Sequence, residues 1–458
     1  MYFSRLILLF LLFRVSAATA LGQAPGGDRF SSYVKWVEKN PASRVSVENV
    51  LIGLTREPGD LVELRKVILD EMQHEASNSD LQSLLSWTYM QQKNFHASFL
   101  QEVALDKRLG EDGSRLMELG QLAVDNRAYN DGIACYRYIV AKGKANQYYE
   151  MARKMILDAE ARKLESMTPA SRAKELSAVT RNFELFLKDF PRGNGTSEVM
   201  YGLAKLEARY LDSFDRAIDL LEKTLALPQT SDALQAQCKL EMGDISMVSG
   251  NIWDAALYYG QVAKSFGEEP VGQEARFRSA RIYYYTGDFF LAKSQLDVLK
   301  TATSELVAND ALKLGLLIQE NTVDDSVAPA LKMFARSELL LYRHKGNQAL
   351  KVLDSIRSKY PGNSLEPEVL MAEAQVHLMG GQAGISAKIL QNVITKYPRS
   401  IRADDAMFQL AGLMETALND RAGASTVYTD LLLKYPGSFY VPESRKRIRI
   451  LRGEKADI

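Results

Sequence analysis

The sequence predicts an all-α protein built as an array of stacked helix–turn–helix pairs. Two observations support this fold class: a short motif recurs at nearly constant spacing, and a small residue is repeatedly followed by apolar residues on one helical face. Hydrophobic residues make up 46% of the 458-residue chain and charged residues 25%, which is typical of an ordinary folded domain.

The recurring motif is an aromatic residue followed by proline. Pro361, Pro398 and Pro436 each follow Lys-Tyr and are 37 and 38 residues apart, and Phe190-Pro191 is an earlier relative. Each motif closes an amphipathic segment, and proline directly after the last turn ends a helix. The motif therefore predicts the end of the second helix in each pair.

Twelve residues before these prolines stands a small or β-branched residue, followed by apolar residues four and seven positions later. The four sets are Val179, Phe183 and Phe186; Ala349, Leu353 and Ile356; Ser386, Leu390 and Val393; and Ala424, Tyr428 and Leu431. This spacing places the three residues of a set on one face of a helix. The small residue allows a neighbouring helix to approach closely.

The same pattern extends toward the N-terminus. Further small residues of this kind are Ser98, Gly132, Ala217, Ala255 and Ala292, and a second small residue lies twelve positions earlier at Ser86, Gly120, Gly243, Ala280, Ala374 and Gly412. The long interval between Ala292 and Ala349 predicts an additional helix over about Ser304–Gln319. We expect about nine helix pairs in total.

Over residues 80–440 this pattern resembles the tetratricopeptide repeat, whose copies carry small residues at positions 8 and 20 and proline at position 32. The resemblance implies a right-handed α-solenoid in which each helix pair buries its apolar stripe against its neighbours. The longer copies are similar to those of bacterial periplasmic and envelope proteins, which implies an interaction scaffold.

The N-terminus predicts an exported protein. A basic start ending at Arg5 precedes the apolar run Leu6–Phe13, and Ala18-Thr19-Ala20 fits a signal-peptidase site. We expect residues 1–20 to be a cleaved signal peptide. The run is too short for a membrane anchor, and no transmembrane segment is expected in the mature chain. The absence of cysteine before Cys135 argues against a lipoprotein. The resemblance to bacterial envelope proteins, rather than the residues, implies the periplasm as the location.

The remaining chain divides into four predicted regions. Residues 21–80 form an N-terminal helical region or cap, split at Pro41 and Pro58; residues 81–320 and 321–440 form the two parts of the array; and residues 441–458 form a capping helix, Val441–Leu451, with a tail. Cys135 and Cys238 fall in different repeats, so two free, buried thiols are expected.

No sequence pattern supports catalysis or a cofactor. The chain has four histidines, and His74-Glu75 lacks a second histidine four positions after the first, as a zinc-protease helix would require. Nucleotide-binding glycine loops and nucleophile elbows are absent. Equal numbers of basic and acidic residues, 57 each, argue against nucleic acid. The basic run Arg445–Arg449 is interpreted as the solvated face of the capping helix.

The resemblance assigns the inward positions of each first helix to a concave groove. The aromatic stretch Ile282–Phe290 then divides: Tyr283 and Phe289 pack in the core, Phe290 packs on the next turn, and Tyr284 and Tyr285 face the groove. The residues expected to bind a partner there are Arg209, Tyr210, Phe277, Arg281, Tyr284, Tyr285, Glu338, Tyr342 and Gln375.

The sequence therefore predicts an exported, non-catalytic scaffold that binds a peptide or helix of an envelope protein in its groove. The alternative from another class is a glycan-binding envelope protein, in which exposed tyrosines stack on sugars. Nutrient-binding proteins with these repeats are usually lipid-anchored and carry a large insertion, and the sequence shows neither feature.

Overall fold

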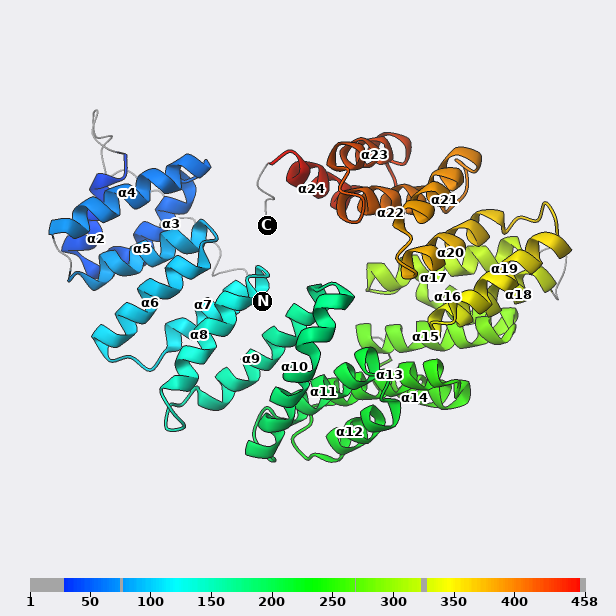
Figure 1. The fold of residues 1–458 in the computed structure, drawn as a ribbon, viewed down its shortest axis with the longest axis horizontal. Coiled ribbons are helices and arrows are strands. Elements are labelled where there is room, and N and C mark those ends of the chain that lie inside the picture. Colours follow the sequence, from blue (N-terminus) through cyan, green and yellow to red (C-terminus); the bar gives the residue numbers. More distant parts are fainter. Residues whose placement is uncertain (1–28, 75–76, 268, 323–327, 454–458) are drawn as a thin grey trace, which may run out of the picture. The chain divides into compact units, whose positions relative to one another are not determined.

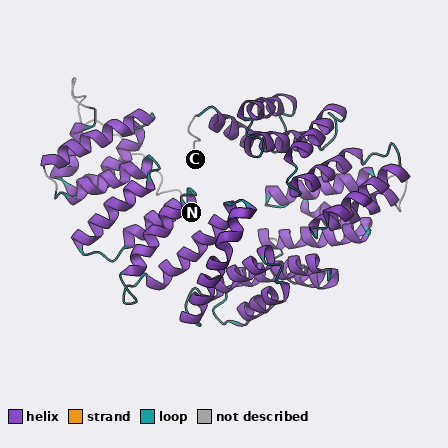
Figure 2. Cartoon of the chain, in the orientation of Figure 1, coloured by secondary structure: helices purple, strands orange, loops and turns teal. Residues whose placement is uncertain are grey.

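The computed structural model describes residues 29–74, 77–267, 269–322 and 328–453, and the regular structure of these residues is entirely helical (Figure 2). The expected signal peptide, residues 1–20, lies outside the described residues. The chain divides into two compact units, unit 1 up to Leu206 and unit 2 from Glu207. The boundary between 320 and 321 that the sequence suggested falls inside unit 2.

Unit 1 begins with the N-terminal helical region and continues with helix pairs (Figure 1). Its elements are α2 (Ser31–Lys39), the 3₁₀ turn η1 (Pro41–Ser43), α3 (Arg44–Leu54), α4 (Pro58–His74), the pairs α5 (Ser79–Gln91) with α6 (Phe95–Leu109), α7 (Ser114–Asp125) with α8 (Tyr129–Ala141), and α9 (Tyr149–Ser166) with α10 (Pro169–Asp189). The unit boundary lies within the next helix, α11 (Thr196–Tyr210).

Unit 2 continues the array with one unpaired helix in its middle. Its elements are α12 (Phe214–Ala226), α13 (Asp232–Ser249), α14 (Ile252–Phe266), α15 (Pro270–Thr286), α16 (Phe289–Leu299), the unpaired α17 (Glu305–Glu320), α18 (Pro329–Tyr342), α19 (Gly346–Lys359), α20 (Glu366–Met379), α21 (Ala383–Lys396), α22 (Ala403–Thr416), α23 (Arg421–Lys434) and α24 (Val441–Leu451). The predicted extra helix and capping helix are therefore confirmed as α17 and α24.

The repeated apolar positions form the core that the sequence predicted. All twelve residues of the four sets that precede the Tyr-Pro or Phe-Pro motifs are buried, from Val179 to Leu431. Both Cys135 and Cys238 are buried free thiols, as expected. Neither helix of a pair could remove this surface from water alone, so stacking supplies the burial.

Small residues in the first helix of a pair make room for an aromatic ring of the second. A Cβ built on Gly120 would lie 2.6 Å from the ring of Tyr136, and one on Gly243 would lie 2.3 Å from the ring of Tyr259. Real Cβ atoms do not approach a ring this closely. The aromatic ring sixteen residues later therefore requires a small residue at this position of the repeat.

The turn inside eight of the pairs uses a residue with positive φ, five positions before the small residue of the second helix. These residues are Lys93, Arg127, Asp212, Gly250, Gly287, His344, Gly381 and Asn419. A single residue in the left-handed region reverses the chain and frees the next segment to start a new helix. The recurrence of this conformation at one repeat position shows that the eight pairs share one turn geometry.

Within unit 2, α18 also contacts helices that are not its neighbours in the chain. The Tyr342 hydroxyl donates to Asp244 of α13 at 3.1 Å, and Arg343 Nε donates to the Met247 carbonyl at 2.9 Å. The Tyr284 hydroxyl of α15 donates to Glu338 of α18 at 2.6 Å. The helix α17 has no partner helix of its own. The next helix, α18, therefore packs against α15 and also contacts α13.

Candidate functional site

A cavity of about 880 Å³ in unit 2 is lined mainly by the first helices of consecutive pairs. We call it the inner cavity. It is lined by Ala208, Arg209, Asp212, Phe214, Glu241, Asp244, Ile245, Val248, Arg281, Tyr285, Phe334, Glu338, Leu341, Tyr342, His344, Glu368, Met371, Ala372, Ala374, Gln375, Leu378, Met379, Ser386, Arg402 and Gln409. Most of these residues come from α11, α13, α15, α18, α20 and α22 or their ends.

One repeat position contributes a polar side chain to this cavity from four successive first helices. Asp244, Arg281, Glu338 and Gln375 each directly follow the small residue of their helix, and all four line the inner cavity. Helix geometry explains this convergence, because equivalent positions of stacked helices point in the same direction. The result is a polar row that crosses the cavity wall.

Arg281 is held between two aromatic rings. Its guanidinium carbon lies 5.4 Å from the ring centroid of Tyr285 and 5.4 Å from that of Tyr342, and it donates a hydrogen bond to the Tyr285 hydroxyl. Stacking of a guanidinium on aromatic faces is a favourable cation–π arrangement. The arrangement fixes the orientation of all three side chains.

Asp244 connects three side chains at the other end of the polar row. Its carboxylate accepts from the Tyr259 hydroxyl at 2.6 Å and from Tyr342 at 3.1 Å, and Arg278 pairs with it at 2.6 Å. The charge of Asp244 is therefore compensated inside the protein. Its role in the cavity wall is to position Tyr342 and, through that ring, Arg281.

Two further carboxylates belong to the wall, the half-buried Glu338 and the buried Glu368. Burial raises the pKa of Glu338, although the Tyr284 hydroxyl, Arg402 and Arg281 oppose this shift. Burial also raises the pKa of Glu368, whose closest cation is Arg402 at 3.7 Å. Arg402 in turn lies 3.3 Å from Asp405. Alternating charges thus stabilise this part of the wall.

The α20 side of the cavity is apolar and open to solvent. Leu378 is 42% exposed and Met379 is 48% exposed, and Met371 lies on the same helix facing the cavity. Exposed methionine beside arginine and tyrosine is typical of protein interaction surfaces. This edge is the part of the cavity where an incoming segment would remove apolar surface from water.

Six of the nine residues that the sequence assigned to the groove line the inner cavity. They are Arg209, Arg281, Tyr285, Glu338, Tyr342 and Gln375. Phe277 instead is half-buried and packs against the hydrophobic core of α15–α20, and Tyr210 is half-buried at the end of α11.

The expected exposure of Tyr284 in the groove is wrong. Its side chain is only 1% exposed, because α18 covers this face of α15 and Glu338 accepts a hydrogen bond from its hydroxyl. The expectation that Phe290 packs on the next turn is also wrong, since that ring is 85% exposed. Phe289 is buried as expected, and Tyr283 is half-buried against the core.

The sequence-based set missed five charged residues of the cavity wall: Asp212, Glu241, Asp244, Glu368 and Arg402. Asp244 could have been found, because it occupies the same repeat position as Arg281, Glu338 and Gln375. Arg402 could not, because it precedes α22 and reaches the cavity only through the packing of α18 and α20.

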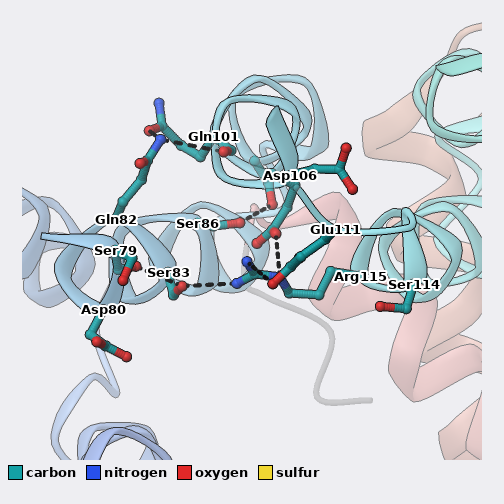
Figure 3. Close-up of polar contacts among 12 residues, drawn as sticks. Ser79, Asp80, Gln82, Ser83, Ser86, Gln101, Asp106, Glu111, Ser114 and Arg115 are labelled. Carbon is teal, nitrogen blue, oxygen red and sulfur yellow. Dashed lines mark hydrogen bonds and ion pairs between the residues drawn. The ribbon is translucent and has the colours of Figure 1, made fainter. Parts of the chain in front are cut away.

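Unit 1 contains a polar cluster that serves packing instead (Figure 3). Arg115 of α7 pairs with Glu111 at 2.9 Å and donates to Ser83 of α5 at 3.0 Å. Ser86 of α5 and Ser98 of α6 share a hydrogen bond of 2.8 Å. Burial raises the pKa of the neighbouring Glu102. These contacts join three helices and leave the groups engaged with one another.

Two other kinds of site are absent from the described part of the chain. Among those residues no group of three or more histidine, cysteine, aspartate or glutamate side chains is placed to hold a metal ion. No helix in the same ranges is long and apolar enough to cross a membrane.

A family model described as "Tetratricopeptide repeat" matches residues 405–438, which comprise most of α22 and all of α23. No curated protein matches the chain. Similar solved structures include Naa15/Naa10 bound to HypK-THB (13% identity, TM-score 0.35, 93% of this chain and 64% of that chain) and yeast Tom70 (12%, 0.30, 91% and 96%). A tetratricopeptide repeat protein from Parabacteroides merdae is also similar (11%, 0.24, 74% and 99%). Identities this low carry no argument about function.

Proposed function

Because the chain carries a tetratricopeptide repeat within an array of such helix pairs, we propose that it is a non-catalytic scaffold that binds a segment of another protein in the inner cavity. The observation that carries this proposal is the composition of the cavity wall. A polar row from the first helices of four successive pairs adjoins an exposed apolar edge at Leu378 and Met379.

The chemistry of the wall favours a peptide or helix as the occupant. The volume of about 880 Å³ suits several side chains rather than a whole domain. Apolar side chains would pack on Leu378 and Met379, while polar groups of the segment would bond to Gln375, one turn earlier on α20, and to Arg209 of α11. Because most charges of the wall are already compensated internally, apolar burial would supply most of the affinity.

The alternative, glycan binding, is less well supported by the site. Sugar recognition would need free aromatic faces, but one face of Tyr285 and one of Tyr342 are covered by Arg281. We therefore favour a protein segment. A glycan array with the purified protein separates the two, since sugar binding would require a signal there.

We further propose that the protein acts in the bacterial cell envelope after export. Support for this comes only from the basic start, the short apolar run and Ala18-Thr19-Ala20 in the sequence. N-terminal sequencing of the protein from the envelope fraction should begin at Leu21. A chain that retains Met1 in the cytoplasmic fraction would contradict the export proposal.

The test of the scaffold proposal is site-specific photo-crosslinking in the native cell. A photoreactive residue at Gln375, which is exposed in the cavity, should capture a discrete protein partner, and Leu378→Ser with Met379→Ser should abolish that product. The same residue at Gln391, exposed on α21, is the matched control. Equal products at both positions, or products unaffected by the double substitution, would contradict binding in the cavity.

A further inference from the structure

A second surface of unit 2, on the second helices α14 and α16, combines exposed aromatic rings with a hollow. Trp253 is 72% exposed and Phe290 is 85% exposed. Each stands two positions before the small residue of its helix, Ala255 or Ala292. Equivalent positions in other copies carry small or polar residues, namely Asp215, Asn347, Gly384 and Ala422. The two rings are thus a local departure from the repeat that folding does not require.

Between these helices lies a hollow of about 380 Å³, which we call the outer groove. It is lined by Ala256, Gly260 and Ala263 of α14, Arg276, Ser279 and Tyr283 of α15, and Ser294, Gln295 and Val298 of α16. The small residues of α14 create the space: a Cβ added at Gly260 would meet no atom within 4 Å.

Helix periodicity places the exposed rings at the edges of this groove. Trp253 precedes Ala256 by three residues and Gly260 by seven, so all three share one side of α14. Phe290 precedes Ser294 by four and Val298 by eight on α16, and the Ser294 hydroxyl donates to the Phe290 carbonyl at 3.0 Å. Both rings stand at the N-terminal ends of their helices.

The base of the outer groove is polar and carries an uncompensated positive charge. Within the described ranges, Arg276 makes no ion pair. The buried Ser279 Oγ likewise has no hydrogen-bond partner there, and its hydroxyl can donate one. A buried polar atom without a partner is costly, and a guanidinium forms charge-assisted hydrogen bonds with a carboxylate. The charge of the groove therefore matches an acidic side chain.

We propose that the outer groove docks a segment of a partner protein that presents an aspartate or glutamate between apolar side chains. The carboxylate enters the hollow and accepts from Arg276 and Ser279. Apolar residues on either side cover Trp253 and Phe290. This surface lies on the second helices and is separate from the inner cavity. An experiment can therefore disprove one of the two proposed sites without affecting the other.

The test is a selection from phage-displayed random 12-residue peptides on the purified full chain, with counter-selection on a Trp253→Ser, Phe290→Ser variant. We expect enriched peptides with an acidic residue flanked by apolar ones. In synthetic versions, replacing the acid by its amide should weaken binding roughly tenfold, as loss of a charge-assisted hydrogen bond predicts. With Arg276→Gln that difference should disappear. Leu433→Ser, at an exposed leucine of α23, should bind as the parent does.

Two results would overturn the proposal. Peptides that depend on Trp253 and Phe290 but carry no acidic residue would refute the carboxylate site. The absence of any enriched peptide that depends on these two rings would refute it as well. If sedimentation velocity shows that the double variant dissociates a dimer of the parent, the surface joins two copies of this chain instead. All variants alter exposed or half-buried side chains, and equal helicity by circular dichroism checks their folding.

Discussion

At the scale of single residues, repeat register identified which positions face inward but not which of them the rest of the chain covers. Arg281, Glu338 and Gln375 line the inner cavity as their register predicted. Tyr284 has an inward register too, yet α18 buries it. The difference depends on packing between segments more than fifty residues apart, which no local pattern encodes.

The two glycines Gly243 and Gly260 should respond oppositely to alanine. Gly243→Ala places a methyl group 2.3 Å from the Tyr259 ring and should cost about 1–3 kcal/mol through overpacking. Gly260→Ala meets no atom within 4 Å and should stabilise by up to about 1 kcal/mol through helix propensity. Urea denaturation followed by circular dichroism measures both. Equal effects on stability would show that the Tyr259 ring does not require a small residue at position 243.

Glu102 should make stability depend on pH in a defined direction. Burial raises its pKa in the folded state above the ordinary value of 4.5, so the folded protein binds this proton more tightly than the unfolded chain. The contribution of Glu102 to stability therefore falls as pH rises through 4.5 toward the raised value. The Tm of Glu102→Gln relative to that of the parent should increase as pH rises from 4 to 7.

Differential scanning fluorimetry across this pH range measures the effect, with the exposed Glu118→Gln as control. A Tm difference for Glu102→Gln that stays constant or shrinks with pH would show that the carboxylate is not penalised by burial.

At the scale of elements, the sequence located nearly every helix but not the consequences of the unpaired one. Proline and small-residue spacing predicted α17 and α24, and the turns at Pro41 and Pro58. Spacing alone could not show that α17 and α22 would come into contact. Lys313 of α17 pairs with Asp405 of α22 at 2.7 Å, across 92 positions of sequence.

This pair should couple the two helices energetically. Asp405 is 4% exposed, so loss of Lys313 leaves a buried carboxylate with Arg402 as its remaining cation. A double-mutant cycle of Lys313→Met and Asp405→Asn should give a coupling energy of about 1–3 kcal/mol, as for contacting buried charges. Hydrogen exchange in Lys313→Met should increase in both α17 and α22. Exchange confined to α17 would contradict the coupling.

At the scale of the whole molecule, composition and periodicity were sufficient to predict the fold class because each helix pair repeats the same local packing and turn geometry. Eight turns place a positive-φ residue at one repeat position, although the residues there range from glycine to lysine and histidine. Backbone geometry is thus conserved among pairs where residue identity is not. The two proposed binding surfaces lie where copies depart from the repeat, at Trp253 and Phe290, or where non-neighbouring helices meet, around Arg281.

The central claim is that the inner cavity binds a protein segment through its apolar α20 edge. The most direct measurement is isothermal titration calorimetry of the segment captured from Gln375, with the parent and with Leu378→Ser, Met379→Ser. The account predicts at least about a tenfold weaker Kd for the double variant, from lost apolar burial, and an unchanged Kd for Trp253→Ser, Phe290→Ser. An unchanged Kd for the Leu378 and Met379 variant would contradict it.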